Sequence, residues 1–112
     1  MIDEIMMDVF PNFIKNLPKA SIPIKGCNAY LLQGDKQQFV FMEFKKDVEL
    51  PEHTHKSQWE IVLEGEVDVW INKEKKSYFK GDRFYIPSNI PHRAFIYAGY
   101  SSIAIFNQKV CY

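Results

Sequence analysis

The 112-residue sequence predicts an all-β fold, and three observations support this prediction. Short segments rich in β-branched and aromatic residues recur at intervals of about ten residues, separated by Gly, Pro or Asn, which is typical of an antiparallel sandwich or barrel. One of them, EVDVWI, alternates with the two-residue period of a strand. A helical pattern occurs only near the N-terminus, where Pro11 and Pro18 interrupt it. We therefore expect a sandwich or barrel preceded by a short irregular or helical segment.

The chain is expected to form a single domain with an N-terminal extension, residues 1–28, that packs on a barrel of residues 29–112. The extension has room for at most two short helical turns. The barrel begins with a hairpin, because AYLLQ at 29–33 is followed by the turn residues Gly34, Asp35 and Lys36 and then by QQFVFMEF. The later predicted strands are QWEIVL, EVDVWI, SYF, RFYIP, HRAFIY and SSIAIF.

The alternation in EVDVWI also predicts which side chains are buried. Successive side chains of a strand point to opposite faces of the sheet. Val67, Val69 and Ile71 therefore share the buried face, and Asp68 and Trp70 lie on the outer face.

Composition and charge narrow the function classes. Fourteen basic and fourteen acidic residues give no net charge, and the local run KEKK at 73–76 is typical of a solvated turn, so we expect no nucleic-acid partner. The acidic N-terminus lacks a secretory pattern, and no apolar run approaches the ~20 residues of a membrane span. We expect a cytoplasmic protein without a membrane partner. Cys27 and Cys111 are predicted to be reduced thiols.

The three histidines are the candidate metal ligands. On one strand, the side chains of His53 and His55 would point the same way, with backbones roughly 6.5 Å apart, so both imidazoles can reach one ion. His92 begins a later predicted strand after the turn PSNIP and can converge with them inside a barrel. The alternative is that His92 caps a turn and the other two are solvated.

Two stretches of this chain resemble the paired motifs of the cupin family. In the first, VELPE and the histidine pair lie between Asp47, which replaces the family's first glycine, and Gly65. The second is GDRFYIPSNIPHRAFI, in which Gly81, Pro87 and His92 match, Asn89 replaces a glycine and Ile96 replaces an asparagine. Asp47 and Asn89 both tolerate a left-handed turn. Fifteen residues separate the motifs. This spacing resembles that of small single-domain cupins of the Cupin_2 type, which implies a double-stranded β-helix, or jelly-roll barrel, with a metal near one mouth.

The resemblance leaves two candidates for the fourth ligand, which is a glutamate in most of the family. Counting back from Gly65 selects Gln58, and counting forward from His55 selects Glu60. Gln58 is preferred, because QWEIVLEGE resembles the QWGIVLEGE found in some cupins, and because glutamine is a ligand in some members, including enzymes that open the ring of unsaturated uronates. Both side chains have the same parity on a strand, so Glu60 is expected to face inward as well.

The resemblance therefore implies His53, His55, Gln58 and His92 as ligands of a divalent transition metal, with zinc, nickel, manganese and iron all compatible. Neutral ligands leave the ion's charge uncompensated, which favours Lewis-acid chemistry over redox chemistry. Glu60 is the candidate general base, and the alternatives are that it completes the coordination or pairs with Arg83 or Arg93.

Two function classes stay open. The first is a non-redox enzyme that isomerises, ring-opens or eliminates from a small oxygenated molecule, such as a sugar acid or keto acid. The second is a non-catalytic cupin that binds a small molecule or metal. A dioxygenase is a third and less favoured reading, and the cupin fold does not choose among them.

Outward aromatic residues suggest an interface. At the two-residue period, Trp59, Trp70, Phe95 and Tyr97 fall on the face opposite the proposed ligands. A sheet with several outward aromatics is usually covered, so we expect a homodimer formed through this face.

Overall fold

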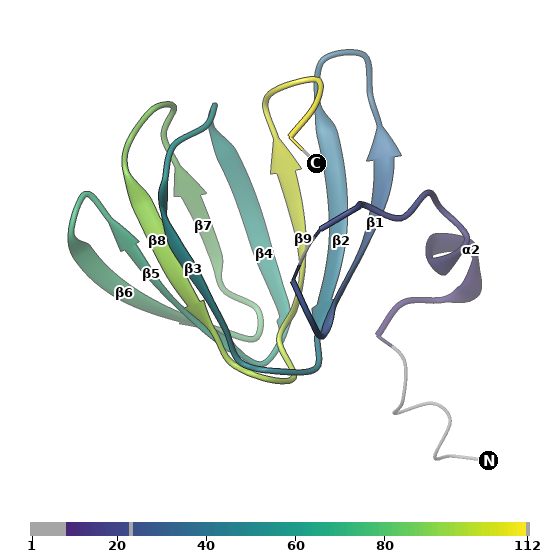
Figure 1. Cartoon of the computed structure of the whole chain (residues 1–112), viewed down its shortest axis with the longest axis horizontal. Coiled ribbons are helices and arrows are strands. Elements are labelled where there is room, and N and C mark those ends of the chain that lie inside the picture. The colour runs from purple at the N-terminus through teal and green to yellow at the C-terminus, as the bar shows by residue number, and fades with distance from the viewer. Residues whose placement is uncertain (1–8, 23, 112) are drawn as a thin grey trace.

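The computed structural model describes residues 9–22 and 24–111 and forms two antiparallel sheets that face each other (Figure 1). The five-stranded sheet has the order β1-β2-β9-β4-β7, and the four-stranded sheet has the order β3-β8-β5-β6. The expected all-β jelly-roll fold is confirmed. The strands are β1 Cys27–Gln33, β2 Gln38–Phe44, β3 Val48–His53, β4 Gln58–Glu64, β5 Glu66–Ile71, β6 Glu74–Phe79, β7 Arg83–Ile86, β8 His92–Ile96 and β9 Ser101–Phe106.

The predicted hairpin is present, because β1 pairs with β2 in antiparallel register from Cys27↔Phe44 to Gln33↔Gln38. The core lies between the sheets, where β2 and β4 bury alternate side chains. Strand pairing also brings candidate site residues to one end of the barrel, the upper end in Figure 1. There Gln58 pairs with both Ile86 and Phe106, and His53 pairs with His92.

The described part of the N-terminal extension contains one short helix, α2 Asn12–Lys15. Before it, the ring of Phe10 packs edge-on against Tyr30 and Phe41. After it, the chain follows β1, with an isolated bridge between Lys19 and Tyr30. The helical pattern predicted near the N-terminus lies in part outside the described residues.

Strand β5 corrects two details of the sequence prediction. Val67 and Val69 are buried as expected, but Ile71 is only half-buried. Asp68 lies on the outer face but is buried there. Ser77 and Tyr97 cover its carboxylate and donate hydrogen bonds to it at 2.6 and 2.7 Å. The KEKK run is not wholly a turn either, since β6 begins at Glu74 and pairs with β5 throughout.

The expectation of one outer face bearing four aromatic residues is wrong. Trp59 lies on β4, in the five-stranded sheet, whereas Trp70, Phe95 and Tyr97 lie on or beside β5 and β8 of the four-stranded sheet. Alternation correctly places each side chain away from the barrel interior, but it does not show which sheet a strand joins.

Two further features bear on the sequence predictions. None of the helices within residues 9–22 and 24–111 is long and apolar enough to cross a membrane. Cys27 and Cys111 are both free thiols, as predicted.

Candidate metal centre

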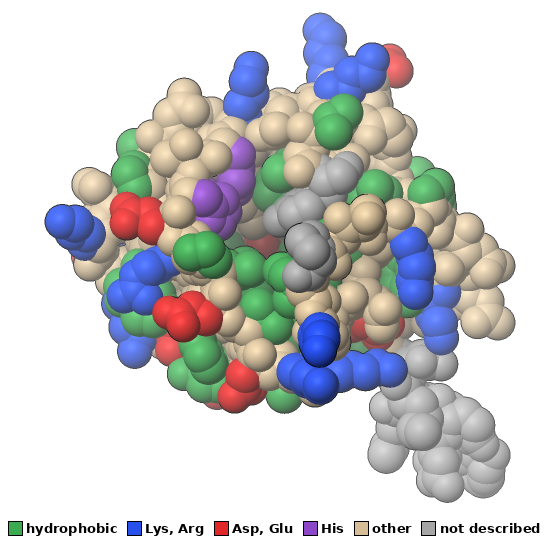
Figure 2. All heavy atoms as spheres, in the orientation of Figure 1, with side chains coloured by type: hydrophobic (Ala, Val, Ile, Leu, Met, Phe, Trp, Pro, Cys, Tyr) green, Lys and Arg blue, Asp and Glu red, His purple; other side chains and the backbone are tan. Residues whose placement is uncertain are grey.

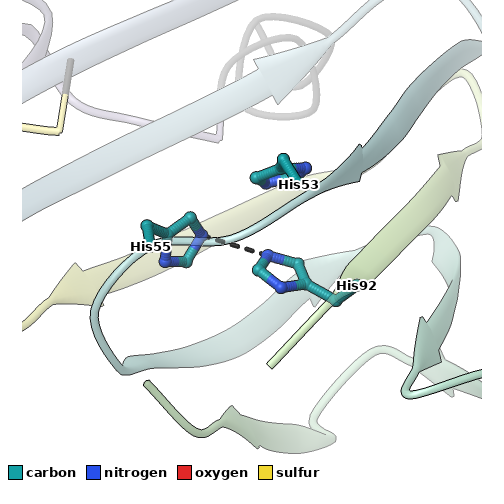
Figure 3. Close-up of side chains that lie close together, drawn as sticks. All are labelled: His53, His55 and His92. Atoms are coloured by element: carbon teal, nitrogen blue, oxygen red, sulfur yellow. Dashed lines mark hydrogen bonds between the residues drawn. The ribbon is translucent and has the colours of Figure 1, made fainter. Parts of the chain in front are cut away.

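The three histidines converge at the open end of the barrel from three different segments (Figure 3). His53 ends β3, His55 lies in the following loop and His92 begins β8. Their nitrogen ligand atoms all lie within 4.8 Å of one another. The prediction that His53 and His55 share one strand is therefore wrong. Convergence arises instead because the β3–β8 register shifts between Leu50 and His53 and because the chain turns after β3.

The second motif supports this arrangement through its turn. Asn89 has φ of +60°, so it adopts the left-handed conformation expected where it replaces a glycine. Its backbone N–H donates to the carbonyl of His55 at 2.9 Å and ties the loop of His55 to the turn that precedes His92. Asp47 does not have a positive φ, and that expectation is wrong. Its carboxylate instead accepts a hydrogen bond from the backbone N–H of Ala98 at 2.8 Å.

The hydrogen bonds of the rings define where their lone pairs point. The Nδ1 atoms of His53, His55 and His92 lie 2.7, 2.6 and 2.9 Å from backbone carbonyl oxygens. A carbonyl oxygen only accepts, so each Nδ1 carries the hydrogen and each neutral ring leaves Nε2 as a bare acceptor. Backbone carbonyls orient metal-binding histidines in this way in many proteins.

The spacing of these nitrogens fits a metal ion. The Nε2 atoms of His55 and His92 lie 3.1 Å apart. Two bare lone pairs at that distance repel each other unless a proton or a cation lies between them. Two ligands at a metal–nitrogen distance of about 2.1 Å and an angle between 90° and 109° place their nitrogens about 3.0 to 3.4 Å apart. The donor set and its geometry therefore fit a divalent transition metal.

The protonation state of the rings agrees with metal binding. Desolvation lowers the pKa of His55 and of His92, and the neighbouring His53 lowers both further, while their backbone hydrogen bonds oppose the shift. The neutral form is the one that binds metal.

Gln58 and Glu60 both face the barrel interior, as their parity on β4 predicted. Both side chains line the cavity that the histidines border. Figure 2 shows the histidines at the edge of a hollow in the surface. Glu60 does not belong to the group of close ligand atoms formed by the three histidines.

The carboxylate of Glu60 is held by two donors. Gln58 Nε2 donates to Oε1 at 2.6 Å, and the Tyr100 hydroxyl donates to Oε2 at 2.5 Å. Desolvation raises the pKa of Glu60, and these hydrogen bonds offset part of the rise. The alternative that Glu60 pairs with an arginine is wrong, because Arg83 is exposed and the guanidinium of Arg93 lies 3.8 Å from the ring centre of Trp70 on the outer face.

Sequence reasoning missed Tyr100. The hydroxyl of this buried residue reaches Glu60 from the turn before β9, forty positions along the chain. Tyr100 lies outside a strand, so no alternation of buried and exposed residues predicted its burial, and it belongs to neither motif.

The chain is similar to a known protein family in sequence and to several solved structures in fold. The family model of the cupin domain, Cupin_2, matches residues 40–99. An RmlC-like cupin from Shewanella frigidimarina superimposes with a TM-score of 0.75 and 27% identity, covering 92% of this chain and 92% of that chain. No curated protein matches the chain significantly in sequence.

Two more distant solved structures share the fold. KdgF from a Halomonas species has a TM-score of 0.72 and 20% identity, covering 83% of this chain and 87% of that one. An oxalate decarboxylase from Bacillus subtilis with Mn(II) centres has a TM-score of 0.73 and 21% identity, covering 88% of this chain but 29% of the enzyme. The family match spans more than half of the sequence and includes every candidate ligand, and the chain belongs to the cupin-domain family Cupin_2.

Proposed function

We propose that this cupin is a non-redox, metal-dependent enzyme that isomerises, ring-opens or eliminates from a small oxygenated molecule. The observation that carries the proposal is the convergence of the three histidines, whose Nδ1 atoms are engaged by backbone carbonyls and whose Nε2 atoms are left to bind an ion. The oxalate decarboxylase among the structural relatives supports a small oxygenated acid as the kind of substrate that this fold can bind.

In this proposal the ligands are His53, His55, His92 and Gln58. Gln58 lines the same cavity, and its amide nitrogen is engaged by Glu60, so its carbonyl oxygen is free to face the ion. Zinc, nickel, manganese and iron are all compatible with three imidazoles and an amide oxygen.

The bound ion would polarise a carbonyl or hydroxyl oxygen of the substrate as a Lewis acid. Glu60 is the proposed proton-transfer residue. It lies in the cavity, and desolvation raises its pKa toward the range in which a carboxyl group can hold or release a proton. Tyr100 donates to Oε2 and holds the carboxyl in place.

Metal analysis of protein purified without added metal tests the proposal. We expect about one divalent ion per chain, and loss of that ion in His92→Ala because an Nε2 ligand is removed. Iron together with oxygen uptake would support the dioxygenase alternative. If no metal co-purifies and His92→Ala leaves metal uptake unchanged, the metal centre is wrong.

Glu60→Gln separates the enzyme from a non-catalytic metal-binding cupin. The amide keeps a similar shape but cannot take up or release a proton at neutral pH, so we expect turnover to fall at least 100-fold while the metal stays bound. Unchanged turnover would exclude the proton-transfer role. A metal-loaded protein without turnover of any keto acid or sugar acid would support the binding alternative.

The cellular setting is also a proposal. We propose a cytoplasmic location, and the balanced charge supports a protein that does not bind nucleic acid. Cell fractionation and a nucleic-acid binding assay test these two statements.

A further inference from the structure

The cavity beneath the histidines has a polar part and a larger apolar part. Apart from the three rings, its polar side chains are Gln58, Glu60 and Tyr100. The rest of the wall is aliphatic or aromatic, apart from the sulfur atoms of Cys27 and Met42, and no Lys, Arg, Ser, Thr or Asn lines it within the described residues. The cavity therefore offers polar contacts at the metal centre and on β4, and apolar contacts elsewhere.

Each of the polar groups already has a partner. The imidazole Nδ1 atoms are bonded to backbone carbonyls. Gln58 and Tyr100 both donate to Glu60, which uses its two oxygens for them. Away from the ion, a ligand hydroxyl would find only the remaining acceptor positions of Glu60 and Tyr100, and no side-chain partner on the aliphatic wall.

The apolar wall is also accessible to a ligand. Ile22, Ile24 and Leu50 are only half-buried, yet they line the same cavity as the histidines. Ile22 and Ile24 belong to the N-terminal extension, and Leu50 belongs to β3, which ends at His53. The molecule that reaches the ion therefore meets aliphatic side chains on its other side.

From these observations we infer that the substrate binds the ion through oxygen atoms at one end and carries a short apolar group at the other. Building on the proposed function, a small oxo or hydroxy acid with an alkyl arm fits this cavity, and a polyhydroxylated sugar acid does not. Each methylene moved from water to an apolar wall strengthens binding about fourfold, whereas each buried hydroxyl without a partner weakens it about tenfold.

The size of the cavity limits the arm. Its volume of about 60 Å³ is shared by the ion, the chelating oxygen atoms and the arm. Only an arm of a few carbon atoms therefore fits.

Metal-chelating hydroxamates test the inference with the protein loaded with Co²⁺, whose visible spectrum reports ligand binding. Acetohydroxamate, propanohydroxamate, butanohydroxamate and pentanohydroxamate differ only in the length of the arm. We expect Kd to fall about three- to fourfold per added methylene until the cavity is full. We expect 3,4-dihydroxybutanohydroxamate to bind at least tenfold more weakly than butanohydroxamate.

A variant of the wall provides a second measurement. Val69→Thr adds a hydroxyl to the cavity lining, so we expect it to reduce the gain in affinity per added methylene across the series. Ile103→Thr, on β9 and outside the cavity lining, is the matched control and should leave the whole series unchanged. Thermal unfolding verifies that both variants fold.

The outcomes distinguish the inference from the proposed function. If acetohydroxamate binds the Co²⁺ protein but longer arms bring no gain, or if the dihydroxy probe binds more tightly than its alkyl counterpart, the apolar-arm inference is wrong and the metal centre stands. If the protein binds no Co²⁺, both the metal centre and the inference that rests on it are wrong.

Discussion

At the scale of single residues, the hydrogen bond between Gln58 and Glu60 determines what Gln58 presents to the cavity. An ionised carboxylate only accepts hydrogen bonds, so it must face the amide nitrogen of Gln58 at the observed 2.6 Å. The carbonyl oxygen of the same amide then lies on the other side. In its ionised form, Glu60 thereby orients Gln58 so that the amide oxygen is available to an ion.

Gln58→Ala removes the proposed fourth ligand. We expect metal affinity to fall about 10- to 100-fold, the range typical for disturbing the shell around a metal site, as measured by competition with a chelator. Gln37→Ala is the control, because Gln37 is half-buried, lies outside the cavity lining and bonds to Asn107. Equal affinity of the two variants would show that Gln58 is not a ligand.

The two thiols should be slow to react. Burial raises the pKa of Cys27 and of Cys111 from 9.0 to about 11, with Glu43 adding to the shift at Cys27. Because the thiolate is the nucleophile, we expect alkylation at pH 8 to be about 100-fold slower than in urea-unfolded protein and to speed up as the pH approaches 11. Mass spectrometry of iodoacetamide adducts measures this, and equal rates in folded and unfolded protein would contradict it.

At the scale of elements, the β4–β5 turn depends on Gly65. Its φ is +79°, and a Cβ there would lie 2.8 Å from the Cα of Tyr100 and 2.9 Å from the carbonyl oxygen of Gly99. Glycine is required both for the left-handed backbone and for the close approach of the next turn. That approach also brings in Tyr100, whose hydroxyl reaches Glu60.

Gly65→Ala should therefore lower the free energy of unfolding by about 2 to 4 kcal/mol, as measured by urea denaturation. Gly81→Ala is the matched control, because Gly81 has φ of +90° but nothing lies within 4 Å of the point that a Cβ would occupy. We expect that variant to lose only about 1 to 2 kcal/mol, the cost of the left-handed backbone. Similar losses in both variants would contradict the steric argument.

The sequence was sufficient to predict the strands whose side chains alternate. It also predicted the β1–β2 hairpin, where the turn residues lie between two apolar runs. It was insufficient for β3, because Pro51 lies inside that strand and the register shift beside it places His53 and His55 on different elements. The histidine group was predictable from residue type and motif spacing. Tyr100 was not, since its contact with Glu60 depends on how two distant turns meet.

At the scale of the whole molecule, one outer surface is largely apolar. In the five-stranded sheet, registered partners form a row across every strand, consisting of Leu32, Phe39, Ile105, Trp59 and Tyr85. Leu32, Trp59 and Tyr85 are 46, 38 and 57% exposed. We therefore propose that the expected homodimer forms through this sheet rather than through the Trp70 side of the four-stranded sheet.

Trp59→Glu should convert the proposed dimer to a monomer, because it places a charge within the exposed apolar row. Phe95→Glu makes the same kind of change on the other sheet and should leave the mass unchanged. Light scattering after gel filtration measures both. A monomeric wild-type protein would contradict the homodimer, and a monomer produced only by Phe95→Glu would assign it to the opposite sheet.

The site's position between the sheets has a mechanical consequence. His53 and His92 belong to the four-stranded sheet and Gln58 to the five-stranded sheet, and these sheets share no strand among the described residues. An ion held by all three would add a cross-link at the rim, where the loops 54–57 and 87–91 already connect the two sheets. Loss of the ion would then loosen the rim first, and faster amide hydrogen exchange around residues 53–58 and 87–92 would record that loosening.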